Sequence, residues 1–157
     1  NQSRRQRQMC IRDRKRSIEI KADVVSKDEK ENGLRAILNF GHTFGHALET
    51  IGNNKLYTHG EAVALGMLAA TKLSESISDL DPKVFDRVHS TIKNTGIKVK
   101  LKKKIFPKKL IKLMQSDKKK NNSQLKFILL EKIGKAKIKS VTNEVTIENA
   151  IKNSLFY

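Results

Sequence analysis

The sequence has 157 residues, of which 38% are apolar and 31% charged, and its formal net charge is +17. This length suits one domain or a large piece of a bigger protein. The apolar runs are too short to span a bilayer and no secretion-signal pattern is present, so we expect no membrane partner. The single cysteine, Cys10, excludes an internal disulfide and fits a reducing compartment, so we expect a cytoplasmic protein.

The positive charge is concentrated in two stretches. Residues 1–16 carry seven basic groups and one acid, and residues 98–120 carry eleven lysines and one aspartate. The first stretch is rich in arginine, whereas the rest of the chain uses lysine almost exclusively. We therefore interpret residues 1–16 as a disordered or foreign basic head and place the folded domain at residues 17–157. A basic arm that binds nucleic acid or membrane is the alternative for the head.

The first half of the proposed domain has the apolar spacing of helices. Residues 17–31 (SIEIKADVVSKDEKE) favour a short amphipathic helix. Residues 34–51 predict a second helix, which Gly52 and the asparagines after it would end. Residues 60–77 predict a third helix, rich enough in alanine to be deeply buried.

The second half predicts three more helices and a hairpin. Asp81 is a candidate N-cap for a helix that stops at Gly96, and a short helix is expected from Pro107 through Met114. Two brief runs with strand character flank Gly134, and Asn143 would cap a final helix. The sequence therefore predicts a mainly helical domain with a small β-hairpin.

Three of the four histidines lie within 18 residues. His42 and His46 are four residues apart, which stacks their side chains on one face of a helix, and His59 starts the next predicted helix. This pattern suits a divalent metal, or one ligand beside a proton carrier, because zinc sites with an open position commonly take three His or Glu ligands. The zinc-protease pattern H-E-x-x-H is absent, since residue 43 is threonine.

Simpler structural roles remain open for these residues and their neighbours. A buried histidine is usually structural, and spacing alone does not decide for a metal. Glu49 could be a third ligand, although an ordinary helix carboxylate is the simpler interpretation; Glu61 at a helix start is most simply a favourable partner of the helix dipole. His89 is expected to be exposed and without a partner. Gly41 and Gly45 would let another backbone, or a substrate, approach closely.

The sequence strings around the histidines resemble one enzyme family. The strings GLRAILNFGHTFGHALE and HGEAVALGM closely resemble the 3-dehydroquinate synthase family of sugar-phosphate cyclases, and the resemblance covers roughly residues 15–155. The iron-containing alcohol dehydrogenases are a looser relative. That group generally lacks the Arg-x-x-x-Asn-x-Gly-His lead-in seen here from Arg35 to His42.

The resemblance implies a two-domain, NAD-dependent enzyme, of which this chain resembles only the helical C-terminal domain. The family's metal is zinc or cobalt, held by two histidines and one glutamate. The histidines correspond to His42 and His59, whereas the glutamate lies upstream of the matching region. The NAD domain is missing as well, so we expect this chain to be inactive alone and its full-length form to be a homodimer.

The resemblance also implies roles in converting a seven-carbon keto-acid phosphate to 3-dehydroquinate and phosphate, in aromatic amino acid biosynthesis. His46 corresponds to the family's proton-handling histidine. Lys21, Arg35 and Asn39 correspond to positions that bind the substrate. A phosphate-binding lysine corresponds to Lys118, with Lys119 as the alternative.

Two other functions remain as alternatives. Another sugar-phosphate cyclase would differ in its pocket residues, and Arg35 with Lys21 favours a substrate with a carboxylate. A basic helical module that binds nucleic acid would use the lysine stretch. Aromatic residues make up only 5% of the chain and no recognition-helix pattern is present, so we expect no nucleic-acid partner.

Overall fold

The structure is a computed structural model that describes residues 2–30, 33–53, 55–119 and 125–156. The chain divides into two compact units, residues 1–38 and residues 39–157, and each is described by itself. Within the described residues no helix is long and apolar enough to cross a bilayer.

The first unit holds helix α1 (Gln2–Lys27) and most of a 3₁₀ helix, η1 (Leu34–Asn39). Helix α1 is longer than the helix expected at residues 17–31, because it includes the arginine-rich stretch for which we expected no regular structure. The interpretation of that stretch as foreign stays a prediction. The expected amphipathic packing is weak, since Ile18 is 69% exposed and only Val24 and Val25 are half-buried.

The helix predicted at residues 34–51 is divided into two, which corrects the sequence-based expectation. Helix α2 (His42–Ile51) begins after Gly41, whose φ of 83° is in the left-handed region. Glycine adopts this conformation without strain. A Cβ on Gly41 would also lie 2.6 Å from the backbone nitrogen of Met67, so only glycine fits between η1 and α2.

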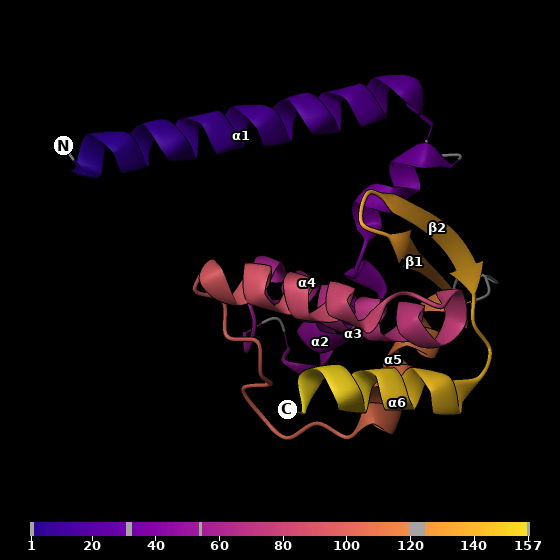
Figure 1. The fold of residues 1–157 in the computed structure, drawn as a ribbon. Coiled ribbons are helices and arrows are strands. Elements are labelled where there is room, and N and C mark those ends of the chain that lie inside the picture. The colour runs from indigo at the N-terminus through magenta and orange to yellow at the C-terminus, as the bar shows by residue number, and fades with distance from the viewer. Residues whose placement is uncertain (1, 31–32, 54, 120–124, 157) are drawn as a thin grey trace. The chain divides into compact units, whose positions relative to one another are not determined.

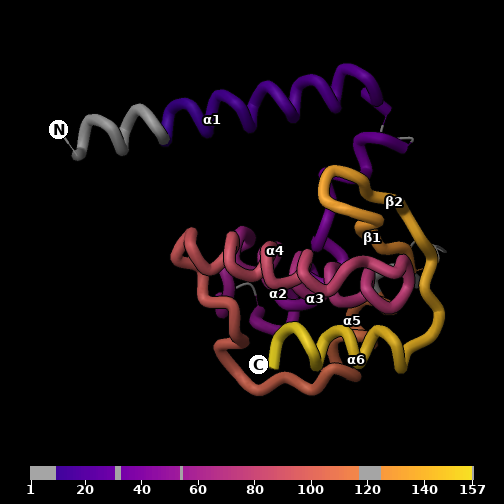
Figure 2. Tube along the Cα trace, viewed as in Figure 1, coloured from indigo at the N-terminus to yellow at the C-terminus, as the bar shows by residue number. Residues whose placement is uncertain are grey.

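Helix α3 (His59–Ser78) is the centre of the second unit. It packs against α2, α4 (Pro82–Asn94), α6 (Glu144–Leu155) and strand β1, as Figure 1 and the trace in Figure 2 show. Its alanines and leucines provide the buried surface, with Leu65, Leu68 and Leu73 at most 1% exposed. The prediction of a deeply buried third helix is confirmed.

The remaining helices begin at the caps read from the sequence. The side chain of Asp81 accepts a hydrogen bond from the backbone of Lys83, and Asn143 caps α6 through the backbone of Thr146. Helix α5 (Pro107–Lys119) starts at the proline as predicted but runs five residues past Met114. It packs against α2 and α6.

Strands β1 (Lys126–Lys132) and β2 (Lys135–Ser140) form the predicted antiparallel hairpin, with Ile128 opposite Ile138. Gly134 in the turn has a φ of 83°, which favours glycine there. Phe127 and Leu129 alternate into the core next to α3, so the hairpin is part of the helical body. The fold is mainly α with a small β-hairpin, as the sequence predicted.

Candidate metal centre

Close backbone contact between α2 and α3 sets the geometry of the site. A Cβ on Gly66 would lie 2.1 Å from the carbonyl oxygen of Gly41, and a Cβ on Gly45 would lie 3.1 Å from Cα of Val63. The glycines noticed in the sequence therefore make room for another backbone, that of α3. This contact places the start of α2 beside Gly66 and Met67 in the middle of α3, whereas α3 begins beside Glu49 in the second half of α2.

Three imidazole rings from α2 and α3 lie close to one another. His42 is the first residue of α2, His59 is the first residue of α3, and His46 lies one turn along α2. The ring centroids are 5.4 Å apart for His42 and His59, 5.5 Å for His42 and His46, and 6.2 Å for His46 and His59. One small volume thus contains six ring nitrogens.

His42 is half-buried, whereas His46 and His59 are exposed. Burial lowers the pKa of His42 from its ordinary value of 6.5, and the two neighbouring rings lower it further. The backbone of Phe40 opposes this shift, although Nδ1 of His42 is buried without a hydrogen-bond partner among the described residues. Near neutral pH this ring is therefore uncharged, which is the form that binds a cation.

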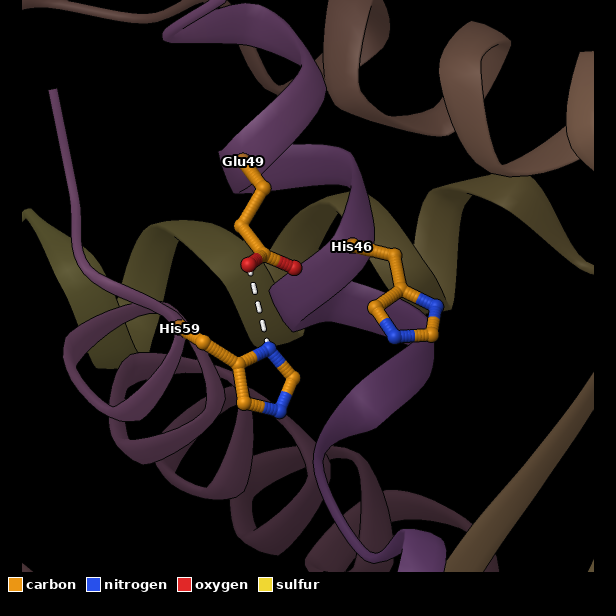
Figure 3. A group of neighbouring side chains, drawn as sticks. All are labelled: His46, Glu49 and His59. Carbon is orange, nitrogen blue, oxygen red and sulfur yellow. Dashed lines mark hydrogen bonds and ion pairs between the residues drawn. The ribbon is translucent and has the colours of Figure 1, made fainter. Parts of the chain in front are cut away.

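Glu49, two turns along α2 from His42, belongs to the same cluster. Its Oε1 lies 3.0 Å from Nδ1 of His59 (Figure 3). His46, Glu49 and His59 each offer one potential ligand atom, and these three atoms lie within 4.8 Å of one another. Glu49 therefore contacts an imidazole of the site, and its role as a metal ligand stays a hypothesis.

Lys102, from the lysine-rich stretch of residues 98–120, contacts the start of α3. Thr58 and Glu61 form a reciprocal capping box, and Nζ of Lys102 lies 2.9 Å from the Glu61 carboxylate and 3.0 Å from the carbonyl of Leu56. The hydrogen bond from Lys102 is the main reason that the pKa of Glu61 falls to about 2. The backbone of Lys102 also donates to the hydroxyl of Tyr57. These contacts fix the loop that delivers His59.

Sequence reasoning missed the role of Lys102 because a lysine run normally forms a solvated face. The composition carries no signal that separates Lys102 from its neighbours, since its contacts come from residues more than 40 positions away. Glu61 does more than favour the helix dipole, because it links the cap of α3 to this lysine. His89 lies outside the cluster; it is half-buried, with its ring 5.9 Å from that of Phe85, so the expectation of an exposed, unpartnered residue is wrong.

The other residues assigned through the resemblance lie on α1, on η1 and at the end of α5. Lys21 on α1 is exposed, and Arg35 in η1 donates to the carbonyl of Glu29, 2.8 Å away; both lie in the first unit. Asn39 ends η1, three residues before His42. Lys118 and Lys119 are in the last turn of α5, and their side chains lie outside the described part of the chain.

The chemistry of the cluster fits a transition-metal cation. Zinc and cobalt take imidazole nitrogen and carboxylate oxygen, and the cluster offers both. Burial and the neighbouring rings lower the pKa of His42, which favours the uncharged form of this ring that binds a metal. Two or more of these side chains could therefore hold a divalent ion.

The fold of the second unit and its histidine site are those of one class of proteins. The fold is that of the helical C-terminal domain of sugar-phosphate cyclases. The chain superimposes on a crystal structure of 2-deoxy-scyllo-inosose synthase complexed with carbaglucose-6-phosphate, NAD+ and Co2+, with a TM-score of 0.75 and 26% identity over 88% of this chain and 40% of that one. ValA, the 2-epi-5-epi-valiolone synthase of Streptomyces hygroscopicus, solved with NAD+ and Zn2+, matches in fold with a TM-score of 0.74, at 22% identity over 88% of this chain and 38% of that one.

The chain belongs to the 3-dehydroquinate synthase family. The family model described as "3-dehydroquinate synthase C-terminal" matches residues 2–120. The chain is 48% identical over 122 residues to the 3-dehydroquinate synthase of Nitrosomonas europaea, covering 78% of this chain and 33% of the relative. It is 42% identical over 130 residues to that of Thermoanaerobacter pseudethanolicus, covering 83% and 36%. The chain thus spans about a third of the length of these relatives.

Proposed function

We propose that this chain is the metal- and substrate-binding part of a 3-dehydroquinate synthase. The full-length protein would convert 3-deoxy-D-arabino-heptulosonate 7-phosphate to 3-dehydroquinate and phosphate, with NAD bound by a domain outside this chain. The observation that carries the proposal is the proximity of three imidazoles from α2 and α3, in a chain that belongs to this family. The chain spans about a third of the length of these relatives, so the activity is proposed for the full-length protein.

In this proposal His42 and His59 bind zinc or cobalt. Their rings are 5.4 Å apart, a separation that lets both reach one cation, and the glutamate that completes the family's ligand set comes from outside this chain. The bound ion would supply Lewis acidity to the hydroxyl groups around the carbon that NAD oxidises. The lowered pKa of His42 supports its role, since a ligand must be unprotonated.

His46 handles a proton in this proposal. It is exposed and lies one helical turn from His42, within reach of the same bound molecule. An imidazole can accept a proton from a substrate hydroxyl and return it near neutral pH. Lys21, Arg35 and Asn39 would bind the anionic and hydroxyl groups of the substrate, and Lys118 or Lys119 its phosphate.

A different sugar-phosphate cyclase is the second candidate, because 2-deoxy-scyllo-inosose synthase shares the fold at 26% identity. The 42–48% identity to 3-dehydroquinate synthases favours the first candidate. We also propose that the full-length protein is a cytoplasmic homodimer, as the resemblance implies.

Substitution of the histidines in the full-length protein tests the proposal. His42→Ala and His59→Ala should each weaken zinc binding by more than about 100-fold. This loss exceeds the one expected when a residue that only orients a metal ligand is removed. His46→Ala should keep the metal and reduce phosphate release by about 10²–10⁴-fold. Metal content by mass spectrometry and a phosphate-release assay measure both effects.

His89→Ala is the matched control, since this histidine lies outside the cluster and should affect neither measurement. Stoichiometric zinc in both His42→Ala and His59→Ala would contradict the ligand assignment. A full-length protein that releases phosphate faster from a substrate without a carboxylate would favour the second candidate.

A further inference from the structure

Glu49 and His59 form a contact that the proposed ligand set does not use. Their side chains come from different helices, and Oε1 of Glu49 lies 3.0 Å from Nδ1 of His59. The Glu49 side chain is 21% exposed and that of His59 60%. The carboxylate thus lies on the inner side of the pair, fixed by its position on α2.

The contact determines which nitrogen of His59 carries a proton. An ionised carboxylate can only accept a hydrogen bond, so Nδ1 must be the donor. In the neutral ring the other nitrogen, Nε2, is then unprotonated and has a free lone pair. Figure 3 shows Nε2 of His59 on the side of the ring away from Glu49. The free lone pair therefore faces away from the carboxylate.

We propose that Glu49 is a positioning residue that holds His59 in the tautomer and orientation a metal ion requires. Histidine ligands commonly donate their second ring N–H to a carboxylate, which fixes the ring and raises the basicity of the ligating nitrogen. This inference deepens the proposed function and rests on its assignment of His59 as a ligand. It gives a function in the metal site to Glu49, to which the resemblance assigned no role.

The neighbouring structure keeps the pair together. Lys102 holds the chain at the start of α3 in place through the carbonyl of Leu56 and the carboxylate of Glu61. The capping box at Thr58 sets the direction in which α3 leaves the loop, one residue before His59. Because these contacts restrain the backbone beside His59, Glu49 and His59 cannot turn away from each other at low cost, and the hydrogen bond between them orients the His59 ring.

Two other roles for Glu49 make different predictions. As a direct ligand, it would lose its anionic donor in both Glu49→Gln and Glu49→Ala, and both variants would lose most of their zinc affinity, because a neutral amide oxygen suits zinc poorly. As an ordinary surface carboxylate, it would pair with His59 only when the ring is charged, and would leave the neutral ring without a preferred tautomer.

The test uses the full-length protein, which would supply the third ligand, with two measurements on each variant. Nitrogen-15 NMR at a pH where the ring is neutral reports the tautomer of His59 without metal, and competition with a chelator reports the zinc dissociation constant. We expect the Nδ1–H form in the wild type. Glu49→Gln should retain that tautomer, because its amide oxygen still accepts, with a loss of zinc affinity of about 10-fold. Glu49→Ala should lose the tautomer preference, with a loss approaching 100-fold.

Glu148→Ala is the control, because this carboxylate on α6 pairs with Lys152 and should change neither measurement. An Nε2–H tautomer in the wild type, unchanged zinc affinity in Glu49→Ala, or equal losses above about 1,000-fold in both Glu49 variants would each overturn the positioning role. A wild-type full-length protein that takes up no zinc would contradict the metal site of the proposed function as well. Zinc uptake that is indifferent to Glu49 would overturn this inference alone.

Discussion

Helix α3 packs against two of its neighbours, α2 and β1, through different kinds of contact. Against α2 the contact is backbone on backbone, and it exists because Gly41, Gly45 and Gly66 have no side chains. Against β1 the contact is made by side chains: Phe127 and Leu129 fill the core, and Oγ of Ser74 accepts a hydrogen bond of 2.9 Å from the backbone of Leu130. The histidine site lies at the first contact, where the backbones leave the least space.

The difference between these two contacts indicates where the domain tolerates substitutions. A side-chain contact can adjust by changing rotamers, whereas a backbone contact can adjust only by moving a whole helix. Movement of α2 against α3 would separate His42 from His59, so the fold and the site depend on the same glycines. The hairpin can be weakened without disturbing the histidines. Three substitutions, from the largest expected effect to the smallest, test this view.

Gly66→Ala should have the largest effect. The new Cβ would lie 2.1 Å from the carbonyl oxygen of Gly41, a distance that backbone atoms do not tolerate. We expect a loss of about 3 kcal/mol or more in the free energy of unfolding, together with loss of zinc binding. Chemical denaturation and chelator competition measure the two effects.

Gly60→Ala is the matched control in the same helix, because no atom lies within 4 Å of its added Cβ. It should leave the free energy of unfolding unchanged or slightly raised, since alanine favours helix more than glycine does. Equal stability of the two variants would show that the backbone contact between α2 and α3 is not decisive.

Ser74→Ala should have an intermediate effect, confined to the hairpin. Ser74 is fully buried, and its loss leaves the amide of Leu130 without its acceptor. We expect a loss of about 1–2 kcal/mol in the free energy of unfolding, with unchanged zinc affinity. Hydrogen exchange at the amide of Leu130 should accelerate.

Ser154→Ala provides the comparison for the buried hydroxyl. Ser154 is also buried, but its hydroxyl donates to carbonyls of its own helix, at Ala150 and Ile151, rather than to another element. Its replacement should cost less than that of Ser74. A larger loss for Ser154→Ala would contradict the view that Ser74 connects the hairpin to α3.

Lys102→Met should have the smallest effect, and one that depends on pH. The pKa of Glu61 lies at about 2, below its ordinary value of 4.5, chiefly because of its hydrogen bond with Lys102. A lowered carboxyl pKa contributes stability that is present above pH 4.5 and is lost as the pH falls from 4.5 to about 2. The difference in free energy of unfolding between wild type and Lys102→Met should therefore shrink over this range.

Urea denaturation at a series of pH values measures that difference. Lys103→Met is the control, because Glu61 pairs with Lys102 rather than with this exposed neighbour, and the variant should follow the wild type at every pH. A difference between wild type and Lys102→Met that stays constant from about pH 6 to about pH 2 would show that Lys102 does not act through Glu61.

The elements that the sequence predicted well are those with local determinants. Asp81 and Asn143 cap helices through contacts within three residues, and Gly134 turns a hairpin by its own conformation. The division of the expected helix at Gly41 was not predictable in this way, because its cause is Met67 on another helix. The extent of α1 was also missed, since composition suggested a head without regular structure.

The candidate site, too, was predicted where its determinants are local in the sequence. Spacing brought His42, His46 and His59 together as a candidate metal site, and the resemblance assigned a role to each. The net charge of +17, by contrast, pointed toward nucleic acid. Glu49 was a candidate ligand from its spacing, but its partnership with His59 depends on a loop that spacing does not describe. Lys102 gave no signal because its partners are distant in the chain.

Helices α2 and α3 run antiparallel, because Gly41 lies beside Gly66, Gly45 beside Val63 and Glu49 beside His59. The first turn of α3 therefore faces the last turns of α2, and the macrodipole of α3 directs its positive end toward Glu49. The carboxylates of Glu49 and Glu61 both lie at this end, where negative charge is favoured. A cation bound to His59 would thus lie beside carboxylates that offset the positive end of the helix.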